Sequence, residues 1–200
     1  NDLCYDLWEL SDFRPDFQTA ENPAAEAAAL LRGLFTPEDF PYIGGLQDAK
    51  NPEAVKARNS WIELFETAGK VESPFFCINP VRPEGAANSN GEKSFRTAAN
   101  IASFKYALSE NDKAPLRDQA AFWLKMIGKG FPVRALIYSG NKSIHAIFQA
   151  DAADLPELKK IFGKLGFDPQ TFDPARTSRL PGHSRGDTGK YQSILFLKGA

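Results

Sequence analysis

The sequence is poor in the residues and patterns that would place it in the simplest classes of protein. Its two cysteines, Cys4 and Cys77, have no CxxC spacing, which excludes a cysteine zinc site and a disulfide framework. It contains no signal-peptide pattern, no run of about 18 apolar residues, no internal repeat and no low-complexity segment. With 200 residues, 42% of them hydrophobic, we expect a soluble cytoplasmic protein with one substantial domain and no membrane partner.

Net charge is almost absent as well, but the charges are unevenly spread. The formal net charge is −1. Residues 125–200 carry 12 Lys and Arg against 6 Asp and Glu, whereas residues 1–124 carry 12 against 19, so the two parts have net charges of +6 and −7. A basic C-terminal half can hold phosphates although the total is nearly neutral.

Helix signals dominate the first seventy residues. Asn22-Pro23 and Asn51-Pro52 each place a capping side chain before a proline suited to the first helical turn, and apolar residues then recur at helical spacing. Gly69 is expected to end the second helix. We therefore interpret residues 1–72 as a mainly helical N-terminal extension and residues 73–200 as the core.

That core mixes strands with helices. Apolar patterns predict strands at 75–78, 101–108, 133–138, 143–149 and 193–197, helices at 115–127 and from Asp154 to about Gly166, and an exposed loop at 80–91. The order lacks strict βαβ alternation, so we expect the α+β class.

An acidic pair, Glu110-x-Asp112, stands at the end of one predicted strand. If the strand continues that far, its period of two aims both carboxylates to one face, where they suit a hard cation such as Mg²⁺ or Mn²⁺. The alternative is a solvated loop entrance without a metal.

A hairpin carries the second group, Ser139-Gly140-Asn141-Lys142-Ser143-Ile144-His145. Alternation along the strand places Ser143, His145 and Ile147 on one face. The histidine, Lys142 and the turn's backbone N–H groups could bind the phosphates of a nucleotide. The alternative is a histidine satisfied within the sheet and a lysine in solvent.

The third group lies between Gly166 and Arg185. Asp168 and Asp173, each followed by proline, precede Arg176, Arg179 and Arg185. One aspartate could supply a third metal ligand, and the arginines could make charge-assisted contacts to phosphate. The alternative is a set of turn formers and surface charges.

The order of the three groups resembles the three motifs of the archaeo-eukaryotic primase (AEP) superfamily, the primase-polymerases. An acidic pair, a turn of the type SGxKSxHA at residues 139–146, RLPG at residues 179–182 and Gln192 before a closing apolar strand follow one another here. The block is similar to primase domains of phage and plasmid replication proteins and of CRISPR-associated primase-polymerases. The likeness spans roughly residues 75–198.

This resemblance implies an α+β fold with an RRM-like antiparallel sheet, flanking helices and an N-terminal helical or αβ extension. It also implies a nucleotidyltransferase, a DNA primase or DNA-directed polymerase, with a two-metal site for Mg²⁺ or Mn²⁺. The implied roles are metal binding by Glu110, Asp112 and Asp168, with Asp173 as the alternative third acid; triphosphate binding by Lys142, Ser143 and His145; and nucleotide or template contacts by Arg176 and Arg179. The first acid is Glu where Asp is commonest.

The implied substrates are a single-stranded DNA template and ribo- or deoxyribonucleoside triphosphates. A helicase or another replication or CRISPR-adaptation domain in a longer protein is the implied partner. Two other functions stay open: a non-catalytic nucleotide- or nucleic-acid-binding module with the same fold, and a metal-dependent nuclease. The nuclease has no evident use for the Ser-x-His group.

Overall fold

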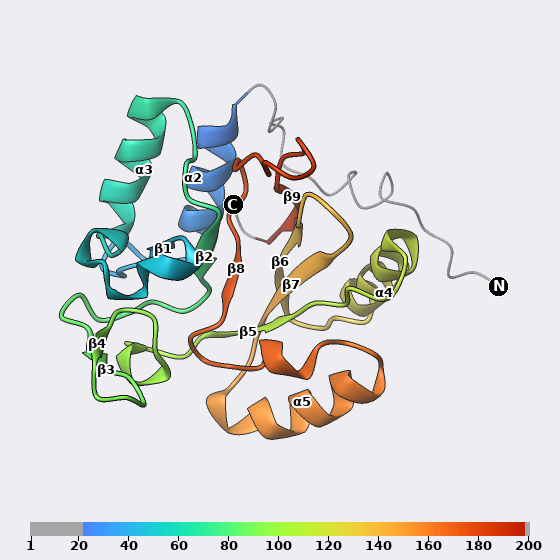
Figure 1. Cartoon of the computed structure of the whole chain (residues 1–200). Coiled ribbons are helices and arrows are strands. Elements are labelled where there is room, and N and C mark those ends of the chain that lie inside the picture. Colours follow the sequence, from blue (N-terminus) through green and yellow to red (C-terminus); the bar gives the residue numbers. More distant parts are fainter. Residues whose placement is uncertain (1–21, 199–200) are drawn as a thin grey trace.

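In the computed structural model, which describes residues 22–198, a four-stranded antiparallel sheet forms the C-terminal half (Figure 1). The predicted strands at 133–138 and 193–197 are confirmed from end to end, while the strand predicted at 101–108 begins only at Tyr106. The strand order is β5-β7-β6-β9, with β5 at Tyr106–Ser109, β6 at Val133–Tyr138, β7 at Ile144–Gln149 and β9 at Ser193–Leu197.

Two helices cover one face of this sheet, α4 (Leu116–Gly128) and α5 (Leu155–Lys164). Alternation along β7 sends Ile144, Ala146 and Phe148 into their core, where Phe148 stacks on Phe162 of α5 with ring centroids 5.5 Å apart. Ile147 belongs to the core on the other face, and His145 shares its parity. The predicted division of this strand between two faces is therefore confirmed.

A second sheet lies beyond that other face. Its order is β1-β2-β8, with β1 at Ile43–Gly44, β2 at Phe75–Cys77 and β8 at Thr177–Arg179. Because β8 follows α5 in the chain yet pairs with β2, the C-terminal segment ties the two halves together. The remaining elements are helix α3 (Arg58–Ala68), a small hairpin of β3 (Ala86–Ala87) and β4 (Lys93–Ser94), and 3₁₀ turns η1 (Leu46–Lys50), η2 (Pro52–Ala54), η3 (Ala98–Asn100), η4 (Ala152–Asp154) and η5 (Pro169–Thr171).

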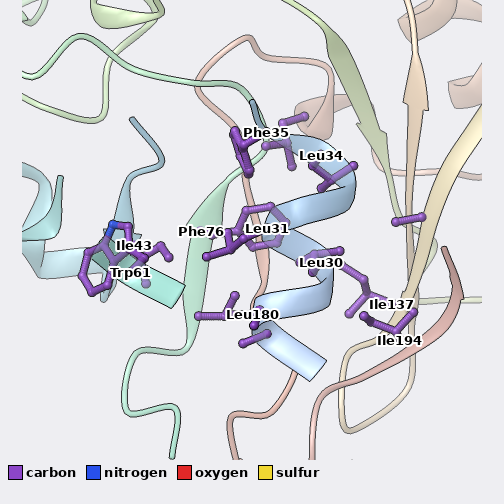
Figure 2. Packing of buried hydrophobic residues seen from close by; sticks show 14 of the residues in the cluster. Leu30, Leu31, Leu34, Phe35, Ile43, Trp61, Phe76, Ile137, Leu180 and Ile194 are labelled. Atoms are coloured by element: carbon purple, nitrogen blue, oxygen red, sulfur yellow. The ribbon is translucent and has the colours of Figure 1, made fainter. Parts of the chain in front are cut away.

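Helix α2 (Pro23–Leu34) fills the space between the sheets. Asn22 caps it as expected, its Oδ1 accepting from the Ala25 backbone N–H at 3.0 Å. Figure 2 shows Leu31 lying toward Phe76 of β2, and Leu30 toward Ile137 and Ile194 of the four-stranded sheet. No break in packing occurs at residue 72 in the described part of the chain, because α2 shares its core with both sheets and β1 pairs with β2.

Local hydrogen bonds explain where the elements depart from the predicted ranges. Asn51 caps only the short η2, and α3 begins at Arg58 because Val55 is extended and bridges Tyr42. The strand predicted from Ile101 starts late because the buried Asn79 side chain accepts from the backbone N–H groups of residues 105 and 106. Gly69 ends α3 at φ 64°, as predicted.

Cys77 is buried in β2, which raises the pKa of its thiol to about 12, and Cys4 lies outside the described residues. Within residues 22–198, no helix has the length and apolar character needed to cross a membrane.

We expect Leu31→Ala to lower the free energy of unfolding by ~3 kcal/mol, because Leu31 is fully buried between the sheets. The matched control is Leu64→Ala on α3, whose side chain is 47% exposed and which should cost under about 1 kcal/mol. Urea unfolding followed by circular dichroism measures both. Equal effects of the two substitutions would contradict the placement of α2 in the common core.

Candidate active site

A polar cavity of about 830 Å³ lies where the two sheets meet. The four-stranded sheet contributes residues from the end of β5 and from the β6–β7 turn, and the second sheet contributes β8 and the loop before it. A further wall comes from the segment around β4 and η3, with Ser94, Arg96 and Thr97. The predicted residues Glu110, Asp112, Lys142, Ser143, His145, Asp173, Arg176 and Arg179 all line this cavity.

Glu110 is the centre of the site. It follows β5 directly, and its side chain is only 16% exposed. One carboxylate oxygen, Oε2, lies 2.8 Å from His145 Nε2, and the other, Oε1, lies 3.2 Å from Arg176 Nη2. Both carboxylate oxygens therefore have cationic or N–H partners, each from a different segment of the chain.

The pKa of Glu110 records this environment. Burial alone raises it, but the hydrogen bond and charge of His145, followed by the charge and hydrogen bond of Arg176, outweigh burial and lower the pKa to about 2. Glu110 is consequently ionised throughout the physiological pH range and acts only as a hydrogen-bond acceptor.

Asp112 lies in a different environment although it lines the same cavity. Asn111 turns inward, and its Oδ1 accepts from the backbone N–H groups of Lys113 and Ala114. Asp112 consequently faces solvent with 52% of its side chain exposed, and its Oδ2 lies 3.5 Å from Lys142 Nζ. Strand β5 has already ended at Ser109, so the two carboxylates reach the cavity through the turn and not through strand alternation.

Hydrogen bonds from several elements fix the β6–β7 turn. The Ser139 N–H donates to the Ser143 carbonyl at 2.9 Å, the two serine hydroxyls are 3.1 Å apart, and Gly140 adopts a φ of 77° that suits glycine. Gln119 on α4 donates to the Lys142 carbonyl at 2.9 Å and accepts from the Ile144 N–H at 2.8 Å. Sequence reasoning missed Gln119, whose only signal was a polar side chain next to the apolar face of its helix.

The two candidate third acids occupy different positions. Asp173 lines the cavity, and its Oδ1 accepts from the Ala175 N–H at 2.7 Å. Asp168 is not among the lining residues; its Oδ1 caps η5 by accepting from Gln170 N–H at 2.8 Å. Its backbone nevertheless adjoins the site, because its N–H donates to the Glu110 carbonyl at 2.9 Å.

The arginines on the cavity wall differ in their surroundings. Arg179 lies over the Phe75 ring, 4.4 Å from the centroid, and burial followed by the nearby charge of Arg185 lowers its pKa. Arg185 pairs with Asp187 at 2.6 Å. Arg185, one of the three arginines predicted to contact phosphate, also lines the cavity, whereas Phe75 and Arg96 were given no site role because no local pattern shows which distant residues will meet in space.

Comparison with solved structures decides the fold. A scan against protein-family models found no match, and no curated protein matched in sequence. The AEP domain of the cyanophage S-2L primase-polymerase (PP-N190) superposes with a TM-score of 0.52 at 18% sequence identity, over 93% of this chain and 94% of that chain. The chain has an archaeo-eukaryotic primase fold. The predicted α+β class, with its antiparallel sheet and flanking helices, is thereby confirmed.

In this AEP fold, the donor chemistry fits a hard divalent cation. Glu110, Asp112 and Asp173 offer carboxylate oxygens to one cavity, and each oxygen of Glu110 has a second lone pair beyond its ion-pair partner. Within residues 22–198, however, no three His, Cys, Asp or Glu side chains are gathered closely enough to form a metal cluster. Metal binding by Glu110 and Asp112, with Asp168 or Asp173 as the third acid, therefore stays a prediction.

The ion pairs of Glu110 predict an acid-sensitive contribution to stability. A carboxyl whose pKa is lower in the folded state stabilises the fold above its unfolded pKa, and loses that contribution as the pH falls toward the folded value. For Glu110 the window runs from its ordinary 4.5 down to about 2. We expect Glu110→Gln to be less stable than wild type by ~3 kcal/mol near neutral pH, with the difference shrinking through this window.

Urea unfolding in the presence of a chelator tests this expectation at several pH values. Glu63→Gln is the control, since Glu63 is exposed on α3. A difference between wild type and Glu110→Gln that stays constant down to about pH 2 would contradict the ion-pair assignment.

Proposed function

We propose that this chain is a primase-polymerase catalytic domain that transfers nucleotides from nucleoside triphosphates onto a chain paired with single-stranded DNA. The observation that supports it most strongly is one cavity in which acidic residues meet a set of cationic and N–H donors. The AEP fold favours this chemistry. Because one fold can host many functions, the proposal rests on the residues of the cavity.

The cationic side of the cavity suits a triphosphate. Lys142 lies 60% exposed at the tip of a turn whose backbone is fixed, which suits a point charge reaching a phosphate. Arg176 has a buried Nε–H without a partner among the described residues, a donor that a phosphate oxygen could satisfy. Such donors, held in place before substrate arrives, stabilise the charge that develops during phosphoryl transfer.

His145 donates through Nε2 because the ionised Glu110 only accepts. A triphosphate oxygen is an acceptor of the same kind, so nucleotide binding exchanges one anionic partner of this N–H for another. Arg176 Nη2 makes the same exchange, and both changes release the Glu110 carboxylate.

The acidic side suits metal ligation. When bound by Glu110 and Asp112 with a third acid, Mg²⁺ or Mn²⁺ would activate a 3′ hydroxyl and neutralise the leaving pyrophosphate. The chain's own part is to hold the reacting groups in line between the acids and the cationic wall.

We expect Asp112→Ala to reduce nucleotide incorporation to background while leaving the fold intact. Its carboxylate is half exposed and its pair with Lys142 spans 3.5 Å, so its loss costs little stability. The assay is incorporation of labelled nucleotide on single-stranded DNA with Mg²⁺ or Mn²⁺, with and without a primer. Asp151→Ala, an exposed aspartate outside the cavity, should behave like wild type.

Nucleotide incorporation by a well-folded Asp112→Ala protein would contradict this proposal. Nucleotide binding without incorporation under either metal would instead indicate a non-catalytic module with this fold.

His145→Ala should raise the KM for nucleotide by roughly tenfold to a hundredfold with a smaller change in kcat, because it removes a charge-assisted hydrogen bond to bound triphosphate. Steady-state kinetics on a primed template separate the two constants. An unchanged KM would show that His145 does not bind the nucleotide and is only a structural partner of Glu110.

The third acid is decided by two substitutions of equal chemistry, Asp168→Asn and Asp173→Asn. Each aspartate has one carboxylate oxygen that accepts a backbone N–H, and an amide oxygen can replace it in that role. The fold should therefore survive both changes, and the variant that loses incorporation identifies the ligand. Full activity in both variants would exclude a third acid from this segment.

A further inference from the structure

A buried serine on β8 lies behind the histidine of the site. Ser178 is fully buried, and its Oγ lies 3.1 Å from His145 Nδ1. Its backbone pairs with Phe76 of β2, so it belongs to the second sheet, whereas His145 belongs to the four-stranded sheet. The contact therefore crosses between the sheets, and it links Ser178, which does not line the cavity, to His145, which does.

The two nitrogens of His145 have partners of opposite kinds. Nε2 faces Glu110, which only accepts, so Nε2 carries the ring's proton. When the ring is neutral, as at the mildly alkaline pH of the NMR measurement below, Nδ1 is an acceptor and the Ser178 hydroxyl donates to it. When the ring is protonated, Nδ1–H donates to the Ser178 oxygen, so Ser178 is the partner of Nδ1 in both states. No other hydrogen bond of the Ser178 hydroxyl occurs in the described part of the chain, so His145 is the hydrogen-bond partner of this buried group.

We infer that Ser178 is a positioning residue, which holds the His145 ring with Nε2–H aimed at the anionic ligand of the cavity. This inference rests on the proposed function. In the free site Glu110 also fixes the ring, but a phosphate that takes over Nε2–H removes that restraint. Ser178 then supplies the hydrogen bond that keeps the ring from rotating about its Cβ–Cγ bond.

The sequence offers a favourable system for a direct test, because the chain has only two histidines. The second, His183, has its Nδ1 at 3.1 Å from the Val71 carbonyl, which can only accept, so His183 carries its proton on Nδ1. In their neutral forms the two rings are thus opposite tautomers. A ¹⁵N NMR spectrum at mildly alkaline pH should show one ring of each kind, and His145→Ala assigns them.

In Ser178→Ala, the His145 Nδ1 resonance should move downfield, toward the position of an imidazole nitrogen that accepts no hydrogen bond, while the signals of His183 stay in place. Ser178→Thr retains the hydroxyl and should restore the wild-type signal. The matched control is Ser109→Ala, since Ser109 is equally buried, lies on β5 next to Glu110, and has a hydroxyl without a partner among the described residues. A His145 Nδ1 resonance that is the same with and without the Ser178 hydroxyl would overturn the inference.

Nucleotide binding supplies the second readout. We expect Ser178→Ala to raise the Kd for dATP with Mg²⁺ by roughly threefold to tenfold, the effect of one hydrogen bond of ordinary strength, measured by calorimetry. Because Ser178 acts through His145, the double variant Ser178→Ala/His145→Ala should bind dATP as His145→Ala does. Additive losses in the double variant would show that Ser178 acts through another route and would overturn the inference.

The two proposals fail separately. The NMR measurement needs neither metal nor nucleotide, so it tests the positioning of His145 even if the chain incorporates nothing. Conversely, if the protein incorporates nucleotide but Ser178→Ala leaves the His145 Nδ1 signal unchanged, the inference about Ser178 fails and the primase-polymerase proposal stands.

Discussion

The hydrogen bonds that Glu110 accepts from His145 and Arg176 are the interaction on which the site depends. A buried carboxylate is costly unless charged or N–H partners satisfy it, and here each partner comes from a different element: β7 supplies His145 and the loop before β8 supplies Arg176. The four-stranded sheet and the second sheet must therefore meet at a fixed separation for Glu110 to be satisfied. Removing one partner would leave charge buried, which ties the geometry of the site to that of the whole fold.

The interface between the sheets is apolar at one end and polar at the other. Helix α2 fills the apolar end, where Leu30 and Leu31 contact both sheets, and the cavity occupies the polar end. Close packing at the α2 end holds the two sheets in one arrangement, and this arrangement keeps the cavity open. The opposite face of the four-stranded sheet is covered by aromatic side chains around Phe162, so the polar cavity lies on the face that meets the second sheet.

The polar end carries a group that a purely structural interface would not keep. Arg176, which lines the cavity and pairs with Glu110, has a buried Nε–H without a partner among the described residues. An unsatisfied group of this kind costs stability, and proteins retain such groups mainly at functional sites. It is consistent with a cavity whose hydrogen bonds are completed by a ligand rather than by the protein alone.

Whether the sequence predicted an element correctly depended on how far apart along the chain the interacting residues lie. Strand 133–138, the division of β7 between two faces and the cap at Gly69 follow from local rules, namely side-chain alternation and the conformational freedom of glycine. Departures arose where a distant side chain decided the outcome: Asn79 delays β5 by holding the backbone of residues 105 and 106, and the bridge of Val55 to Tyr42 postpones α3.

The sequence by itself determined the chemistry available to the site, because the order of the acidic pair, the Ser-x-His turn and the arginine segment is a property of the chain. Only the tertiary structure decided which of these groups meet. It brought Arg176 to Glu110 across 66 positions of sequence and Ser178 to His145 across 33, and it drew Phe75 and Arg96 into the same cavity. The physical reason is that burial and ion pairing act through space, and no local pattern encodes which strand will pack behind another.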